Sequence, residues 1–188
     1  MIKLSHIITT IAMAVILMAM ASCRDSGEKT ALDRYRTEAP RLANATDSAS
    51  FLYGVANGEG FITAVIKQNT GNLMSVNFEN FFNGLSTTLD ADSATFDTLA
   101  AQTVNIDALV LPQPELSRRY GILAGMSARS FKAYYDIAWD NDKIAEGYYH
   151  GMVHDRADVL PGPLAQEELR AILFRIAAPV DSIQNSSK

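Results

Sequence analysis

The chain has 188 residues, the size of one ordinary domain or two small ones. Hydrophobic residues make up 48% and charged residues 20%, which are globular values that exclude a fully disordered chain. The net charge of −5, without a run of Lys or Arg, excludes a protein that binds duplex nucleic acid through a basic face. The single cysteine, Cys23, excludes an intrachain disulfide and a cysteine zinc cluster.

The first 23 residues have the layout of a secretory signal peptide. Lys3 gives a positive start, and residues 7–20 form an apolar run that is too short to span about 30 Å of hydrocarbon comfortably. The sequence Met20-Ala21-Ser22-Cys23 resembles the bacterial lipobox, in which a lipid is attached to the cysteine sulfur before residues 1–22 are removed. We therefore expect Cys23 to be lipidated. The alternative is an ordinary cleaved signal with a cysteine there by chance.

Lipidation would anchor the mature chain in the cell envelope, because several acyl chains exceed what stable membrane anchoring requires. Arg24 stands where an Asp would retain the protein at the inner membrane in the bacteria for which that rule is known. Its absence favours the outer membrane. Residues 23–49 are polar and contain Pro40, which predicts a tether with one short helix around residues 31–38.

From Ser50 onward, apolar residues recur at steps of three and four, which predicts helices and no strands. Asp47 or Ser48 is expected to cap the first helix. Pro112 and Pro114 form the best internal boundary. The expected helices cover residues 50–70, 76–89, 94–109, 115–139, 143–155 and 164–178. The fold class is thus all-α, with about six helices in two tandem three-helix repeats, 50–110 and 115–178, before a polar tail, 179–188.

The chain resembles itself at a distance of 67 residues. This shift places four residues of the first repeat on identical residues of the second: Ser50, Tyr53, Gly54 and Gly58 on Ser117, Tyr120, Gly121 and Gly125. Without a gap, residues 79–85 then fall on residues 146–152, so that Gly84 meets Gly151. A glycine inside a helix costs about 1 kcal/mol relative to alanine. We therefore expect Gly54, Gly58, Gly121 and Gly125 to form a close helix–helix seam, the alternative being that they fit a crowded ordinary core.

Two of these segments resemble a known family. The pattern Ser50-Phe51-x-x-Gly54-x-x-x-Gly58, followed by Asn77-Phe78-x-x-x-Phe82-x-Gly84-Leu85, resembles the helical amino-terminal domain that precedes FKBP-type peptidyl-prolyl isomerase domains in bacterial envelope proteins. Residues 117–125 and 148–152 resemble it a second time, more loosely, and residues 164–170 are similar to the helix that follows. The resemblance covers about residues 50–178.

The resemblance implies an envelope protein that acts as a dimerisation and substrate-holding module. In that family the isomerase activity belongs to a separate, strand-rich domain, for which this sequence has no strand pattern. We therefore expect a non-catalytic protein that is associated with protein folding and is chaperone-like. The alternative is a peptidyl-prolyl isomerase family member or a metal-dependent protein that uses His150 and His154.

His150 and His154 are four residues apart on a predicted helix, a spacing at which two imidazoles can bind zinc or copper. Gly151 stands where a zinc protease would carry its Glu. We interpret the pair as part of a solvated helix face and as weak metal candidates only; no metal, cofactor or catalytic residue is expected. Asp90-Ala91-Asp92 lacks the later Gly and Glu of a calcium loop and predicts a helix-capping turn.

The aromatic residues of the second repeat form a group, made of Tyr134, Tyr135, Trp139, Tyr148 and Tyr149. Such a group is usually core in a helical protein. The alternative is an exposed groove for extended, unfolded or peptide clients.

For the assembly, we expect a monomer in which the repeats pack as an internal pseudo-dimer, with Gly54 and Gly58 facing Gly121 and Gly125. The apolar face of the first repeat corresponds to a face with three cations in the second: Arg118, Ile122, Arg129 and Lys132. Burying unpaired cations is costly. The second repeat is therefore expected to turn a different set inward: Tyr120, Ala124, Phe131 and Tyr135. The competing assembly is a homodimer through the apolar face of the first repeat. The expected partners are a lipid membrane, through Cys23, and an envelope protein or unfolded client, without nucleic acid.

Overall fold

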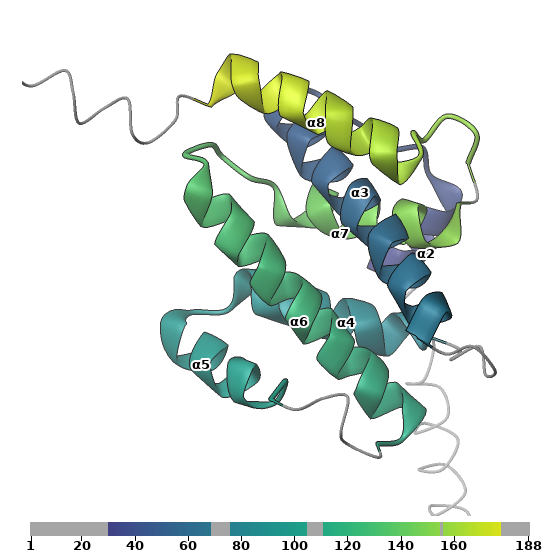
Figure 1. Ribbon diagram of the computed structural model, residues 1–188, viewed down its shortest axis with the longest axis vertical. Coiled ribbons are helices and arrows are strands. Elements are labelled where there is room, and N and C mark those ends of the chain that lie inside the picture. The colour runs from purple at the N-terminus through teal and green to yellow at the C-terminus, as the bar shows by residue number, and fades with distance from the viewer. Residues whose placement is uncertain (1–29, 69–75, 105–110, 155, 178–188) are drawn as a thin grey trace, which may run out of the picture. The chain divides into compact units, whose positions relative to one another are not determined.

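The computed structural model describes residues 30–68, 76–104, 111–154 and 156–177. In this part of the chain all regular structure is helical, which confirms the predicted all-α class (Figure 1). The described helices are α2 (Ala31–Thr37), α3 (Ala45–Gln68), α4 (Phe78–Asp90), α5 (Ser93–Ala101), α6 (Gln113–Tyr134), α7 (Asn141–Val153) and α8 (Gly162–Ile176). Residues 1–22, Cys23 and the tail 179–188 lie outside the described residues.

The chain forms two compact units, Met1–Arg34 and Tyr35–Lys188. In the first, the start of α2 is capped reciprocally: Thr30 Oγ1 accepts the N–H of Asp33, and the Asp33 carboxylate accepts the N–H of Thr30. The second unit already begins in the segment expected to be a tether. Tyr35 is only 4% exposed, and its hydroxyl donates to the carboxylate of Asp142 at 2.7 Å.

The starts of the helices follow from polar side chains that accept backbone N–H groups. Helix α3 begins five residues before Ser50, because Asn44 Oδ1 accepts the N–H of Asp47. The expected caps at Asp47 and Ser48 are therefore wrong. Asp92 caps α5 by accepting the N–H of Thr95, so the predicted capping turn is confirmed.

Helix α6 ends at Tyr134, five residues earlier than expected. The next residue, Tyr135, is extended, with φ −118° and ψ 121°, and its N–H donates to Lys132. From there the chain reaches Asp140, which caps α7. The third expected helix also ends early, at Ala101, and residues 105–110 lie outside the described part.

The helices pair between two halves of the second unit, the first half being α3–α5 and the second α6–α8. Helix α3 packs on α7 and α8, whereas α6 packs on α4 and touches α5 (Figure 1). The first helix of each half thus packs on the second and third helices of the other half. Helices α4 and α7 also meet.

Glycines allow the backbones to touch in the two most extensive helix–helix contacts, α3 on α7 and α6 on α4, which we call the seams. A Cβ atom on Gly54 would lie 2.2 Å from the carbonyl oxygen of Ile144 in α7, and one on Gly147 would lie 2.0 Å from that of Phe51 in α3. In the other seam, a Cβ atom on Gly121 would lie 1.9 Å from the carbonyl oxygen of Phe81. Only a residue without a side chain fits at such distances.

In each seam, glycines of the first helix of one half (α3 or α6) lie against the second helix of the other half (α7 or α4). Gly54 and Gly58 lie against α7, and Gly121 and Gly125 lie against α4. The expectation that Gly54 and Gly58 face Gly121 and Gly125 is therefore wrong.

A buried serine makes the same contact in both seams. Ser50 Oγ accepts the N–H of Asp140, the N-cap of α7, and Ser117 Oγ accepts the N–H of Asn77, the N-cap of α4, each at 3.0 Å. Ser50 and Ser117 are 67 residues apart, as the self-comparison predicts, but the two caps are 63 residues apart. From the buried serine to the N-cap of the following helix, the chain is thus four residues shorter in the second half, 23 instead of 27.

This difference of about one helical turn corrects the ungapped comparison of the second helices. A Cβ atom on Gly84 would meet the carbonyl oxygen of Arg118 in α6. The residue 67 positions before Arg118 is Phe51 in α3, and its carbonyl oxygen would be met by a Cβ atom on Gly147. The counterpart of Gly84 is therefore Gly147 and not Gly151.

Helix α6 buries the face that carries Gly121 and Ile122, which is 0% exposed. The expectation that it turns a different face inward is right only in part. Tyr120 and Phe131 of the expected set do meet rings of α3, those of Phe61 and Tyr53. The face with the three cations packs on α4 as well, because these cations are partly exposed and have polar partners. Arg118 pairs with Glu115, Arg129 donates to the carbonyls of Thr88 and Ala91, and Lys132 donates to Asn141. The guanidinium of Arg129 also lies 4.6 Å from the ring centroid of Phe96. Polar partners reduce the expected penalty for these three cations without removing it, since burial lowers the pKa of Lys132.

Candidate interaction cleft

A cleft of about 720 Å³ lies where α3, α6 and α8 meet. Its apolar and aromatic lining is Tyr53, Ala56, Leu123, Met126, Phe131, Tyr135, Leu169 and Leu173. Its polar lining is Asn57, Ser127, Ser130, Gln166 and Arg170. The walls come from both halves, so the cleft exists only because the halves pack together.

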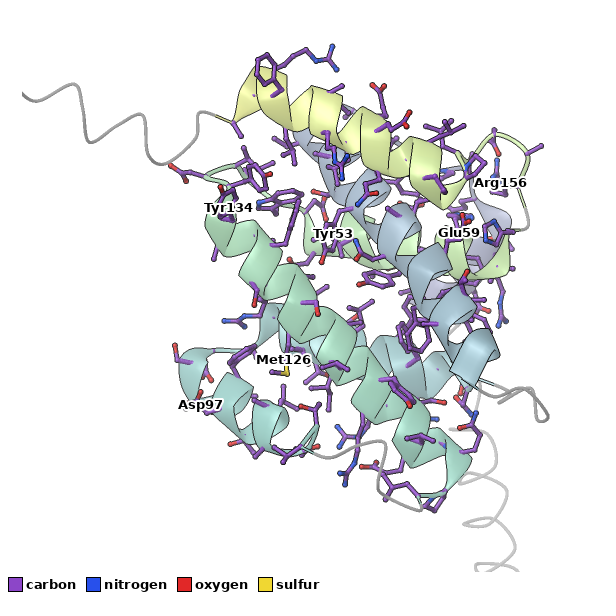
Figure 2. The ribbon with its side chains drawn as sticks, in the orientation of Figure 1. Tyr53, Glu59, Asp97, Met126, Tyr134 and Arg156 are labelled. Carbon is purple, nitrogen blue, oxygen red and sulfur yellow. The ribbon has the colours of Figure 1, made fainter. Side chains whose placement is uncertain are left out.

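Aromatic side chains form one end of the cleft. The ring of Phe131 lies 4.6 Å from that of Tyr53 and 5.0 Å from that of Tyr135, measured between centroids. The ring of Trp139 contacts both Phe131 and Tyr53, with centroid distances of 5.6 and 6.3 Å. Figure 2 shows Tyr53 in the space between the ribbons of α6 and α3. These contacts fix the position of α6 opposite α3 at this end of the cleft.

Tyr53 is a buried, neutral part of the cleft floor. Its side chain is 4% exposed, and its hydroxyl shares a hydrogen bond with that of Tyr148, which is 2% exposed. Burial raises the pKa of Tyr53 to about 12 and raises the pKa of Tyr148 well above its ordinary value. Both hydroxyls therefore keep their protons at neutral pH, and neither can act there as a base.

The rim of the cleft is more accessible than its floor. Leu123 of α6 is 41% exposed, whereas Leu169 and Leu173 of α8 are buried. Ser127, Ser130 and Gln166 are exposed and bring uncharged donors and acceptors to the edge. An apolar floor with a polar rim is typical of a surface that binds part of another molecule.

A second hollow of about 500 Å³ adjoins the cleft and shares Ala56, Asn57 and Gln166 with it. It lies between α3 and the start of α8. There the carboxylate of Glu59 accepts the N–H of Gly162 and lies 3.7 Å from Nε2 of His154. An acidic group at a helix N-terminus interacts favourably with the helix dipole, so Glu59 stabilises the attachment of α8 to α3.

The structure separates the two histidines that were weak metal candidates. His150 is 1% exposed and lies between the rings of Phe51 and Tyr149, so its assignment to a solvated face is wrong. His154 ends α7 with a left-handed backbone, φ 52° and ψ 38°, and is half exposed. Within the described ranges, no group of three or more His, Cys, Asp or Glu side chains could hold a metal ion.

The aromatic group of the second half divides between core and cleft. Tyr148 and Tyr149 are buried, Tyr135 lines the cleft, and Tyr134 is 66% exposed at the end of α6 (Figure 2). Sequence reasoning did not find Leu123 or Arg170. Each is a single residue on the outer side of a helix, and the spacing of apolar residues gives no signal for such a position.

Comparisons with known proteins found no matching family model, no matching curated protein and no matching solved structure. In the described part of the chain, no helix is long and apolar enough to cross a membrane.

Proposed function

We propose that this protein is a non-catalytic, lipid-anchored interaction module of the cell envelope, which holds apolar segments of other proteins in the cleft between its two halves. The cleft is the observation that carries the proposal. It is open and mostly apolar, and the buried hydroxyl of Tyr53 on its floor keeps its proton at neutral pH. Such a surface is suited to binding.

The reciprocal seams support the proposed internal duplication. In the family that the sequence resembles, one copy of the domain pairs with a copy from a second chain. Here α3 packs on α7 and α8, and α6 packs on α4, within one chain. We propose that the two halves derive from one unit and that the chain is a monomer in solution. Light scattering should give the mass of one chain, and the mass of two chains would support the homodimer instead.

Lipidation of Cys23 is tested by fractionation of cells that express the Cys23→Ala variant. The mature domain should move from the membrane fraction, for which we propose the outer membrane, to the soluble envelope fraction. If the variant remains as membrane-bound as the native chain, the anchor is not at Cys23.

The holding activity is tested by light scattering of an aggregating apolar client, such as reduced insulin, with and without the protein. The protein should slow aggregation, and Leu123→Glu, which places a carboxylate on the cleft wall, should weaken this effect. Leu164→Glu is the matched control, because Leu164 is 49% exposed on α8 and does not line the cleft. Equal activity of the two variants, or none in the native chain, would contradict the proposal.

A further inference from the structure

The charge of the cleft indicates what kind of segment it binds. Arg170 is the one charged side chain among the described residues that line the cleft, and the adjoining hollow adds the carboxylate of Glu59, which accepts the N–H of Gly162. Arg170 is exposed on α8 and forms no ion pair with another described residue. An exposed cation that pairs with no described carboxylate attracts an anionic group at short range. The net charge of −5 repels anions at longer range, so the attraction is confined to this point of the rim.

The length of the binding surface sets how many residues of an extended chain it can cover. The cleft and the adjoining hollow follow α8 from Gly162 to Leu173, a distance of about 16 Å at 1.5 Å per residue. An extended chain rises about 3.3 Å per residue, so about five residues would cover this length.

The polar rim favours a polypeptide over an acyl chain. An extended polypeptide exposes its own N–H and C=O groups, which need partners where water is displaced. Ser127 and Gln166 bring a hydroxyl and a carboxamide to the edges. Asn57 and Ser130 add acceptor oxygens, because their N–H and O–H groups donate to the carbonyls of Tyr53 and Met126. An acyl chain has no group that could use them.

We infer that the cleft binds an extended apolar polypeptide segment of about five residues that carries a carboxylate, which pairs with Arg170. This rests on the proposed function and adds the chemical class of the client. The apolar side chains of the bound segment contact Leu169 and Leu173, and its carboxylate stays at the exposed rim beside Arg170.

The test measures fluorescence anisotropy with two dansyl-labelled, amidated peptides of about six residues, built from Leu and Ser and ending either in Glu or in Gln. The protein is the full chain with Cys23→Ala, at about 0.01 M salt, where screening is weak. The Glu peptide should bind about threefold more tightly, as expected for an exposed ion pair. Arg170→Glu should reverse the preference, and the Gln peptide should keep its affinity.

Arg175→Glu is the matched control, since Arg175 lies on the same helix, is exposed and does not line the cleft. It should keep the preference for the Glu peptide. If both peptides bind equally and Arg170→Glu changes neither affinity, the charge inference is overturned while the holding function stands. If neither peptide binds, the holding function falls with it. The inference would also be overturned if the protein bound both peptides with equal affinity and lauryl alcohol displaced them, because the occupant would then be an acyl chain.

Discussion

Replacing a seam glycine with alanine should destabilise the protein far more than its single methyl group suggests. A methyl carbon on Gly54 would lie 2.2 Å from the carbonyl oxygen of Ile144 and 2.6 Å from the backbone nitrogen of Tyr148. Ordinary contact begins near 3.4 Å, so α3 and α7 would have to separate by more than an ångström. The obstacle is backbone, which cannot change its rotamer to make room.

Two opposing contributions set the expected change in the free energy of unfolding: the steric cost of the added methyl group and the higher helix propensity of alanine. Overpacking a core costs about 1–3 kcal/mol and more where the backbone must move. Alanine favours the helix by about 1 kcal/mol over glycine, which offsets part of the cost. We expect Gly54→Ala and Gly121→Ala each to lower the free energy of unfolding by about 2–4 kcal/mol. In a chain of this size the melting temperature would fall by roughly 5–15 °C.

Gly60→Ala is the control within the same helix. Gly60 is exposed, and a Cβ atom there would meet nothing within 4 Å. This variant should gain up to about 1 kcal/mol from helix propensity alone. Urea denaturation followed by circular dichroism measures all three variants in the chain without residues 1–23. If Gly54→Ala were as stable as Gly60→Ala, the close backbone packing between α3 and α7 would be refuted.

Three further predictions follow from the buried contacts. Ser50→Ala and Ser117→Ala should each lower the free energy of unfolding by about 1–3 kcal/mol, because a capping N–H loses its acceptor; unchanged urea midpoints would contradict this. Raising the pH from 10 to 12 should destabilise the protein by roughly 2–3 kcal/mol, because folded Tyr53, with a pKa of about 12, keeps a proton that the unfolded chain loses near pH 10. Thermal melts across that range should show a smaller loss in Tyr53→Phe, and an equal loss would exclude Tyr53 as its source. Fragments 24–104 and 111–188 should be weakly helical alone and recover helicity when mixed, as seen by circular dichroism, since each first helix packs on the other half. Full helicity in either fragment by itself would contradict the exchanged pairing.

The local pattern of the sequence determined the helices and several of their ends. Apolar residues at steps of three and four predict a helix because they place one continuous face against a core. Asp92 caps α5 as expected, since a side chain directly before a helix reaches the free N–H groups of its first turn. The spacing of Gly54 and Gly58 likewise marked a face that another backbone approaches.

Tertiary packing alone decided which backbone approaches that face. A glycine pattern is the same whether its partner is α6, as expected, or α7, as found. The four-residue difference between the two halves arises mostly in the connections between first and second helices, which carry no periodicity. The ungapped comparison therefore matched Gly84 with the wrong residue. The burial of His150 follows from the position of α7 beneath α3, a contact between residues about a hundred positions apart. The cleft, likewise, is built from three helices that no local pattern brings together, because spacing records which side of a helix is buried and not what buries it.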